Sequence, residues 1–206
     1  MALEHRDGVS GRWLLYRSQS EHSEDCDRYP YDAIPRRVFL DTNVINLIVN
    51  HAGTIFEQHE IDVALDETAK DDVEALLHIF QTGQRMGWPI FASHKSLEEL
   101  GRTPEEYGRS ELVAYGARLV DSLSEDARHA ADLGRRLVDA PFTAALPDLA
   151  DRELIGNAIG LGCDVFCTCD RRTIVRKRDR LNLLPIRVLT PPEWWKHIKP
   201  WAGLWL

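Results

Sequence analysis

Long hydrophobic runs are absent from this sequence. No apolar stretch approaches the roughly 18 residues that a membrane-spanning helix needs, which argues against an integral membrane protein. The opening residues, MALEHRDGVSGRW, also lack the apolar core that marks a secretory signal peptide. We therefore expect a cytoplasmic protein with no membrane partner.

Positive charge is also scarce. The 206 residues include 25 lysines and arginines against 33 aspartates and glutamates, which gives a formal net charge of −8. This balance argues against a protein that coats polyanions over its whole surface. It still allows an enzyme that concentrates acids in a metal site and bases on the rim of that site. The length suits one domain with an extension.

Only four cysteines are present: Cys26, Cys163, Cys167 and Cys169. Three of them cluster in the segment CDVFCTC, but no second pair stands at the spacing of a zinc site. We therefore expect buried free thiols here instead of a zinc site. A disulfide framework is not needed in a reducing cytoplasm.

Short apolar runs alternate with helical patterns along most of the chain. The apolar runs predict buried strands at 38–40, 89–93, 164–169 and 186–189. Hydrophobic residues at helical spacing predict helices at 44–51, 68–87, 105–123, 125–139 and 148–161. This order indicates an α/β fold with a mainly parallel central sheet flanked by helices.

Both ends of the chain stand apart from this pattern. Residues 1–36 are polar, so we expect an N-terminal extension that is loosely structured or strapped over a domain of residues 37–206. Residues 13–16 could form an edge strand. The helical pair expected within 105–139 forms an insert. Packing explains the tryptophan-rich C-terminal tail better than base stacking does.

Carboxylates gather where predicted strands end and predicted helices begin. Asp41 follows the run VFL, and Asp170 follows FCTC. Because the carboxyl ends of parallel strands meet at one edge of a sheet, and ligands bind there, we expect these two acids to lie close together. Further acids stand at helix starts expected near the same edge: Glu98, Glu99, Asp148 and Asp151.

Each acid also has a purely structural interpretation. Glu99 can complete a capping box that begins at Ser96, and Asp148 can cap the helix whose first turn contains Asp151. The two acids at strand ends can cap the helices that follow them. Several carboxylates crowded on one edge would repel one another, however, and a bound divalent cation relieves that repulsion. Oxygen ligands suit Mg²⁺ or Mn²⁺.

Four segments, VFLDTNV, SLEEL, DRELIGNAIGLGCDVFCTCD and IRVLTPPEW, together resemble a PIN domain, the metal-dependent nuclease fold of VapC-type toxins. The resemblance covers about residues 37–195. It implies four acids that act as metal ligands and catalytic residues: Asp41, Glu99, Asp151 and Asp170, with Glu98 as the alternative to Glu99. It implies polar support from Asn43, Thr168 and Asp148. The implied substrate is RNA, cleaved with a 5′-phosphate left on one product.

The resulting hypothesis is an endoribonuclease in which one or two metal ions, held by the acids, promote phosphodiester hydrolysis. The segment RRTIVRKRDR, directly after Asp170, supplies bases for substrate phosphates: Arg171, Arg172, Arg176, Lys177, Arg178 and Arg180. The family also implies a homodimer and an antitoxin-like protein partner. Because the extension and the insert are longer than in many of these toxins, a processing or defence role stays open beside the toxin role.

Two other classes of function compete with this hypothesis. A PIN-like fold without turnover would be a catalytically silent nucleic-acid-binding or interaction module. A phosphoryl-transfer protein with Asp41 as its nucleophile is disfavoured. A haloacid-dehalogenase-like phosphatase would place a second aspartate two residues on, where this chain has Asn43. A receiver-like domain would need an acidic pair before its phosphorylated strand, and that pair is missing.

Overall fold

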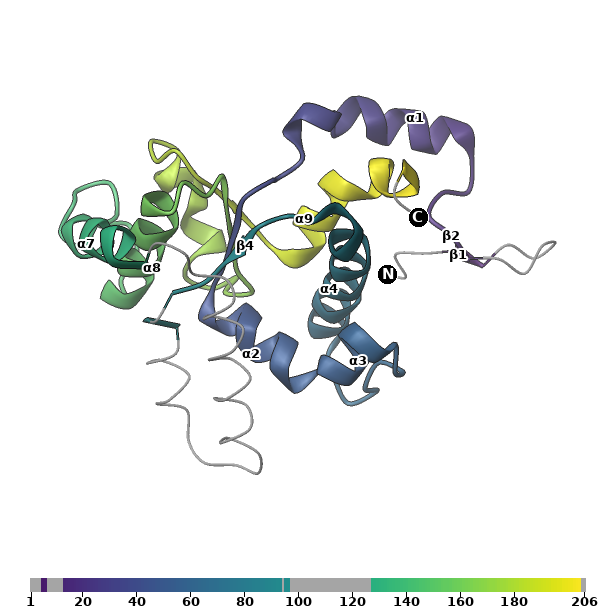
Figure 1. Cartoon of the computed structure of the whole chain (residues 1–206), viewed down its shortest axis with the longest axis horizontal. Coiled ribbons are helices and arrows are strands. Elements are labelled where there is room, and N and C mark those ends of the chain that lie inside the picture. Colours follow the sequence, from purple (N-terminus) through teal and green to yellow (C-terminus); the bar gives the residue numbers. More distant parts are fainter. Residues whose placement is uncertain (1–4, 7–12, 94, 97–126, 205–206) are drawn as a thin grey trace. The chain divides into compact units, whose positions relative to one another are not determined.

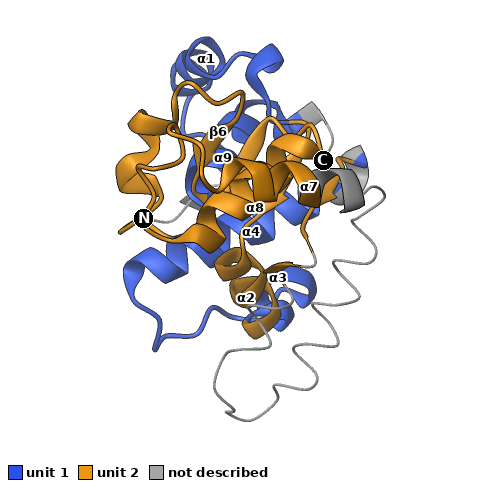
Figure 2. Ribbon diagram, turned by 90° about the vertical axis from the view of Figure 1, so that its left-hand side faces the viewer, with its two compact units in different colours: residues 1–35, 51–87, 191–206 blue, residues 36–50, 88–190 orange. Residues whose placement is uncertain are grey.

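The computed structural model in Figure 1 describes residues 5–6, 13–93, 95–96 and 127–204. The chain divides into two compact units, coloured in Figure 2. Unit 1 comprises residues 1–35, 51–87 and 191–206, and unit 2 comprises residues 36–50 and 88–190. The helix expected at 105–123 and the acids Glu98 and Glu99 lie outside the described residues.

Four parallel strands form the sheet of unit 2. They are β3 (Val38–Leu40), β4 (Ile90–Phe91), β5 (Val165–Cys167) and β6 (Arg187–Leu189). The strand order is β4-β3-β5-β6, and every neighbouring pair is parallel. The predicted α/β class with a parallel sheet is confirmed. A parallel sheet carries helices on its faces, which explains why its strands appear in the sequence as continuous apolar runs.

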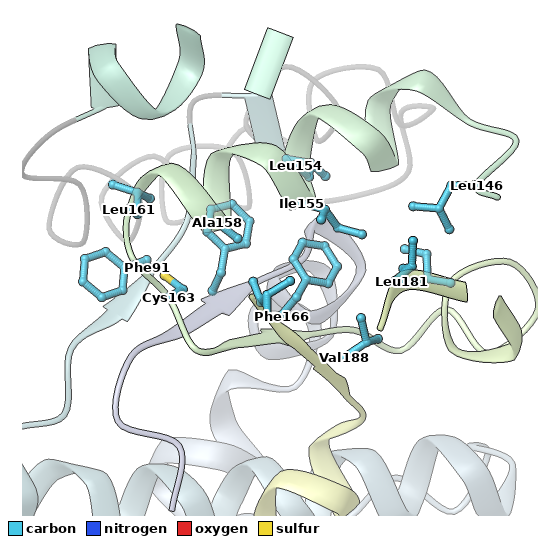
Figure 3. Close-up of a cluster of buried hydrophobic side chains, with 13 residues drawn as sticks. Phe91, Leu146, Leu154, Ile155, Ala158, Leu161, Cys163, Phe166, Leu181 and Val188 are labelled. Atoms are coloured by element: carbon cyan, nitrogen blue, oxygen red, sulfur yellow. The ribbon is translucent and has the colours of Figure 1, made fainter. Parts of the chain in front are cut away.

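A hydrophobic cluster joins one row of the sheet to helix α8 (Leu149–Gly160), as Figure 3 shows. The register places Phe39 beside Phe91 on one neighbouring strand and beside Phe166 on the other. The rings of Phe39 and Phe166 stack, with their centroids 5.6 Å apart. Helix α8 contributes three buried residues to the cluster: Leu154, Ile155 and Ala158. This packing fixes the position of β3 and β5, from which the candidate site extends.

The remaining described helices of unit 2 are α2 (Thr42–Asn50), α7 (Ala127–Leu137) and the 3-10 helix η2 (Val175–Leu181). The helices predicted at 44–51, 125–139 and 148–161 are therefore confirmed as α2, α7 and α8. Helices α7 and α8 cross closely at two glycines. A Cβ added at Gly156 would lie only 2.6 Å from the Cα of Gly134, so the crossing leaves no room for a side chain there.

Unit 1 is built from helices and one short hairpin. The hairpin pairs β1 (His5–Arg6) with β2 (Trp13–Leu14) antiparallel. The helical elements are α1 (Gln19–Arg28), η1 (Tyr31–Ala33), α3 (Ala52–Glu57), α4 (Glu67–Met86), α9 (Pro191–Ile198) and η3 (Lys199–Leu204). Helix α4 is the one predicted at 68–87, and it ends at Gly87 with a φ of 61°.

Helix α1 lies in the N-terminal segment that the sequence predicted to be loosely structured or strapped over the domain. The first turn of a helix has N–H groups without main-chain partners, and here a side chain provides one: the Ser18 hydroxyl accepts from the N–H of Glu21 at 3.2 Å. The Glu21 carboxylate in turn accepts from the N–H of Arg17 at 3.0 Å. This arrangement resembles a capping box, which needs only the Ser-x-x-Glu spacing and no apolar stripe. Because the helix is polar and has no buried residue, hydrophobic periodicity could not predict it.

The C-terminal tail packs as the sequence predicted. Trp194 and Trp195 are buried, and the ring of Trp195 stacks on His78 of α4 with centroids 5.0 Å apart. Trp201 donates from its indole nitrogen to the carbonyl of Tyr29 at 2.8 Å, which ties the tail to the segment after α1. Packing, and not exposure for base stacking, therefore accounts for these tryptophans.

Within the described ranges, no helix combines the length and the apolar character that crossing a membrane requires.

Candidate functional site

Asp41 stands at the junction between β3 and α2. Its carbonyl accepts from the N–H groups of Val44 at 3.0 Å and Ile45 at 3.1 Å, so the helix begins directly after it. Its side chain accepts from the N–H of Thr42 at 2.7 Å. The residue is only 3% exposed. A buried carboxylate is costly unless hydrogen bonds compensate it, and the neighbouring strand end provides them.

Two side chains donate to the same oxygen of Asp41. The Thr168 hydroxyl donates to Oδ2 at 2.6 Å, and Asn43 Nδ2 donates to Oδ2 at 2.7 Å. Thr168 follows β5 and is fully buried. These two bonds satisfy one oxygen of a buried carboxylate. The carboxylate is thus oriented from two separate parts of the chain.

Asn43 connects the two strand ends a second time. Its Oδ1 accepts from the N–H of Cys169 at 2.8 Å, and its Nδ2 also reaches the Thr168 hydroxyl at 3.3 Å. The main chain adds a bond from the N–H of Asp41 to the carbonyl of Cys167 at 3.0 Å. Asn43 therefore uses both ends of its amide, and its expected supporting position beside Asp41 agrees with this geometry.

Asp170 is linked to Asp41 through one side chain. Its N–H donates to the Thr168 hydroxyl at 3.0 Å, and that hydroxyl donates onward to Asp41. The Asp170 carboxylate accepts from the N–H groups of Arg172 and Thr173, each at 2.9 Å, and from the Thr173 hydroxyl. The structure thus places the strand end that carries Asp41 beside the segment that carries Asp170. It also shows Asp170 in the capping position that the sequence left open as an alternative.

The two acids at the start of α8 differ in their surroundings. Asp148 is exposed and caps the helix, since its carboxylate accepts from the N–H of Ala150 at 2.9 Å. Asp151 lies in the first turn and is half-buried. No group of three or more His, Cys, Asp or Glu side chains within the described ranges is arranged to hold a metal ion. The predicted ligand Glu99 stands outside those ranges.

The donor set fits a hard cation by its chemistry. Side-chain oxygens from two carboxylates, one hydroxyl and one amide lie at the carboxyl ends of β3 and β5: those of Asp41, Asp170, Thr168 and Asn43. Mg²⁺ and Mn²⁺ are bound through carboxylate and other oxygen ligands. The residues present are therefore suited to such an ion.

Ser93 and Ser96 follow β4, the strand next to β3; the family resemblance uses Ser93 as the strand-end serine before Glu99, and Ser96 is the expected start of the capping box. Ser93 is 8% exposed and Ser96 is 0% exposed. Among the residues that the structure describes, neither hydroxyl has a hydrogen-bond partner. Buried polar groups normally find partners, and these two hydroxyls are exceptions to that rule. The sequence carries no signal for such a property.

Basic residues continue from Asp170 into η2. Arg172, Arg176 and Arg180 are exposed. Arg171, Lys177 and Arg178 are half-buried. Six cations within ten residues form a local positive surface in a chain whose net charge is −8. They lie on the segment that begins at one of the two linked acids.

Two of the cysteines contact the site through their main chain: the N–H of Cys169 donates to Asn43, and the carbonyl of Cys167 accepts from Asp41. All four are free thiols, and Cys163 and Cys167 are buried, as the sequence predicted. Burial raises the pKa of the Cys163 thiol to about 12, so that group stays neutral.

Comparisons of this chain with family models, with curated proteins and with solved structures found no match.

Proposed function

We propose that this chain is a PIN-like, metal-dependent endoribonuclease that hydrolyses phosphodiester bonds in RNA. The observation that carries the proposal is the buried carboxylate of Asp41, tied through Thr168 to the strand end where Asp170 stands. Two acids separated by more than half of the sequence thus meet at the carboxyl edge of a parallel sheet. Ligands of open α/β sheets bind at that edge.

The acids would hold Mg²⁺ or Mn²⁺. Asp41 and Asp170 are the central ligands of the proposal, and the family resemblance adds Glu99 and Asp151. When bound, such an ion supplies an activated water and stabilises the charge that develops on the phosphate oxygens. Thr168 and Asn43 contribute by fixing the orientation of the Asp41 carboxylate.

Substrate binding is assigned to the basic segment after Asp170. Arg172 and Arg176 are exposed, so their guanidinium groups can contact the phosphates of a substrate. Charge of this kind contributes affinity and steering but reads no sequence, so the proposal names RNA as a class and no particular RNA.

An RNA cleavage assay with the Asp170→Asn variant tests the proposal. Asparagine keeps an oxygen for the N–H groups of Arg172 and Thr173, and the Thr173 hydroxyl can rotate to accept from the new amide. The turn is therefore preserved while the charge is lost. We expect cleavage in Mg²⁺ to fall by at least about 100-fold, since metal-assisted charge stabilisation contributes several kcal/mol to catalysis.

Two controls accompany this assay. Asp132→Asn removes an acid that pairs with Arg135 on the exposed side of α7, and it should cleave like the unchanged chain. EDTA should abolish cleavage by the unchanged chain. Full activity of Asp170→Asn in Mg²⁺, or activity that persists in EDTA, would rule out the metal assignment.

A silent RNA-binding module is the second candidate, and one observation favours it. The Asp170 carboxylate already has a structural role in capping the turn that follows it. This candidate predicts RNA binding with no cleavage in either Mg²⁺ or Mn²⁺, and the same assay, combined with a binding measurement, separates the two functions.

A further inference from the structure

Unit 1 contains a pocket that the proposed nuclease function does not use. It lies between the residues leading into α1 and the C-terminal segment around η3, and its volume is about 500 Å³. Small-molecule sites typically measure about 300–1,000 Å³. Figure 1 shows α1 beside the last helical turns of the chain, and the two elements are in contact. The pocket therefore has the size of a ligand site.

Aromatic side chains form its walls, and hydrogen bonds hold them in place. The Tyr16 hydroxyl donates to Asp25 at 3.1 Å, and His22 Nε2 donates to the carbonyl of Pro200 at 2.8 Å. Trp201 is fixed by its bond to the carbonyl of Tyr29. Burial and the neighbouring Asp25 carboxylate raise the pKa of Tyr16, so its hydroxyl stays a donor. The walls are preorganised, which lowers the cost of ordering them around a ligand.

The charge of the lining is positive. Arg17 and Lys199 both line the pocket, and no carboxylate belongs to the described residues that do. The Lys199 ammonium lies 4.2 Å from the centroid of the Tyr16 ring, so a cation sits directly against an aromatic wall. The nearby carboxylates of Asp25 and Glu21 are engaged by the Tyr16 hydroxyl and by the N–H of Arg17.

We propose that this pocket binds a nucleoside monophosphate, whose base packs against the Trp201 ring and whose phosphate pairs with Lys199, the cation that lies over the Tyr16 ring. Each half of such a ligand matches one feature of the lining. Flat aromatic walls stack bases of any sequence, and a flexible ammonium pairs with phosphate as a point charge. Inorganic phosphate would leave the aromatic walls unused, and an apolar peptide would leave the cations unused. This proposal does not depend on nuclease activity.

Calorimetric titration of the full chain in EDTA tests the proposal with AMP and UMP as probes. We expect at least one of them to bind with a Kd below about 1 mM, and the matching nucleoside and inorganic phosphate to bind at least about tenfold more weakly. Lys199→Gln should weaken nucleotide binding about tenfold, and Lys199→Arg should restore most of it because the charge is kept. Lys196→Gln is the matched control, since Lys196 is exposed on α9 and does not line the pocket.

Several outcomes would overturn the proposal. It fails if neither nucleotide binds, or if Lys196→Gln weakens binding as much as Lys199→Gln does. Equal affinity for inorganic phosphate and nucleotide would reduce the pocket to an anion site. Loss of binding in Asp170→Asn, with normal binding in Lys199→Gln, would place the nucleotide at the sheet edge of unit 2. Cleavage of RNA is decided by its own assay in each of these cases, so the two proposals fail separately.

Discussion

At the scale of single residues, Thr168 is the link on which the candidate site depends. One hydroxyl donates to Asp41 and accepts from the N–H of Asp170, so it uses both of its hydrogen-bonding capacities inside the protein. Its position after β5 places it opposite the end of β3. The geometry of the site therefore rests on one buried side chain with no charge of its own.

Thr168→Val should destabilise the chain. Valine has almost the same shape but removes a donor from a buried carboxylate and an acceptor from a main-chain N–H. We expect the free energy of unfolding, measured in urea, to fall by about 1–3 kcal/mol. Thr168→Ser, which keeps the hydroxyl, should retain most of the stability. If the valine variant were as stable as the unchanged chain, the hydroxyl would not make these bonds in solution.

Residue identity alone could suggest part of this site. Asp41 and Asp170 were recognisable because a carboxylate directly after an apolar run must stand at a strand end. Asn43 and Thr168 could be named as support only through the family resemblance. Thr173, which donates to Asp170, was missed, although a capping aspartate normally accepts from the N–H two or three residues further on.

At the scale of elements, helices α4 and α9 share an interface that contains a buried histidine. His78 of α4 is 7% exposed and stacks on Trp195 of α9. Burial, reinforced by the positive charge of Lys199, lowers the pKa of His78 from 6.5 to about 4. This histidine therefore stays neutral at pH values where the same histidine in an unfolded chain is charged.

The sign of the resulting pH dependence follows from proton binding. Between pH 6.5 and about 4 the unfolded chain binds a proton at His78 and the folded chain does not. The stability that His78 contributes is therefore complete above pH 6.5, is lost as the pH falls towards 4, and changes no further below that. Between pH 7 and pH 5 this loss amounts to about 2 kcal/mol.

Urea denaturation at the two pH values measures this effect. The unchanged chain should lose about 2 kcal/mol more between pH 7 and pH 5 than the His78→Phe variant does. His59→Phe is the control, because His59 is largely exposed beside Glu57 and should leave the pH dependence of the chain unaltered. Identical pH dependence in all three chains would show that His78 titrates normally.

Elements were predictable where an apolar pattern marked them. The four strands of the parallel sheet, α4 and α8 all have such patterns, and each was found at its predicted place. Helices α1 and α3 were not predicted. Helix α1 has no buried residue, so hydrophobic periodicity could not reveal it, and its signal lies entirely in capping. Helix α3 spans only six residues, which is too short for a periodic pattern to stand out.

At the scale of the whole molecule, the distribution of charge matters more than its sum. The chain is acidic overall, yet the segment after Asp170 is densely basic. If that segment contacts RNA phosphates, binding must weaken with salt through counterion release. The acidic rest of the chain repels RNA, so it would not account for phosphate contacts that are confined to this segment.

Arg172→Gln combined with Arg176→Gln should reduce the salt dependence of RNA binding. The slope of log K against log salt should become less steep by about 0.7 for each phosphate of a single strand that the variant no longer neutralises. Arg135→Gln combined with Arg136→Gln removes the same charge from exposed positions on α7 and serves as the matched control. Equal changes in the two double variants would indicate a general charge effect and no defined binding segment.

The sequence by itself determined the class of fold and the edge of the sheet at which Asp41 and Asp170 lie. Apolar runs specify strands and helical spacing specifies the helices between them, and parallel strands necessarily bring their carboxyl ends to one side. These properties depend on residues close together in the chain, so local patterns are sufficient to predict them.

The tertiary structure alone decided how the site is joined and what else the fold contains. The bond between Thr168 and Asp41 spans 127 residues, and it exists only because the register places β5 beside β3. The pocket of unit 1 likewise needs Tyr16 and Lys199 to meet from opposite ends of the chain. Contacts of this range depend on packing and register, which no local pattern specifies.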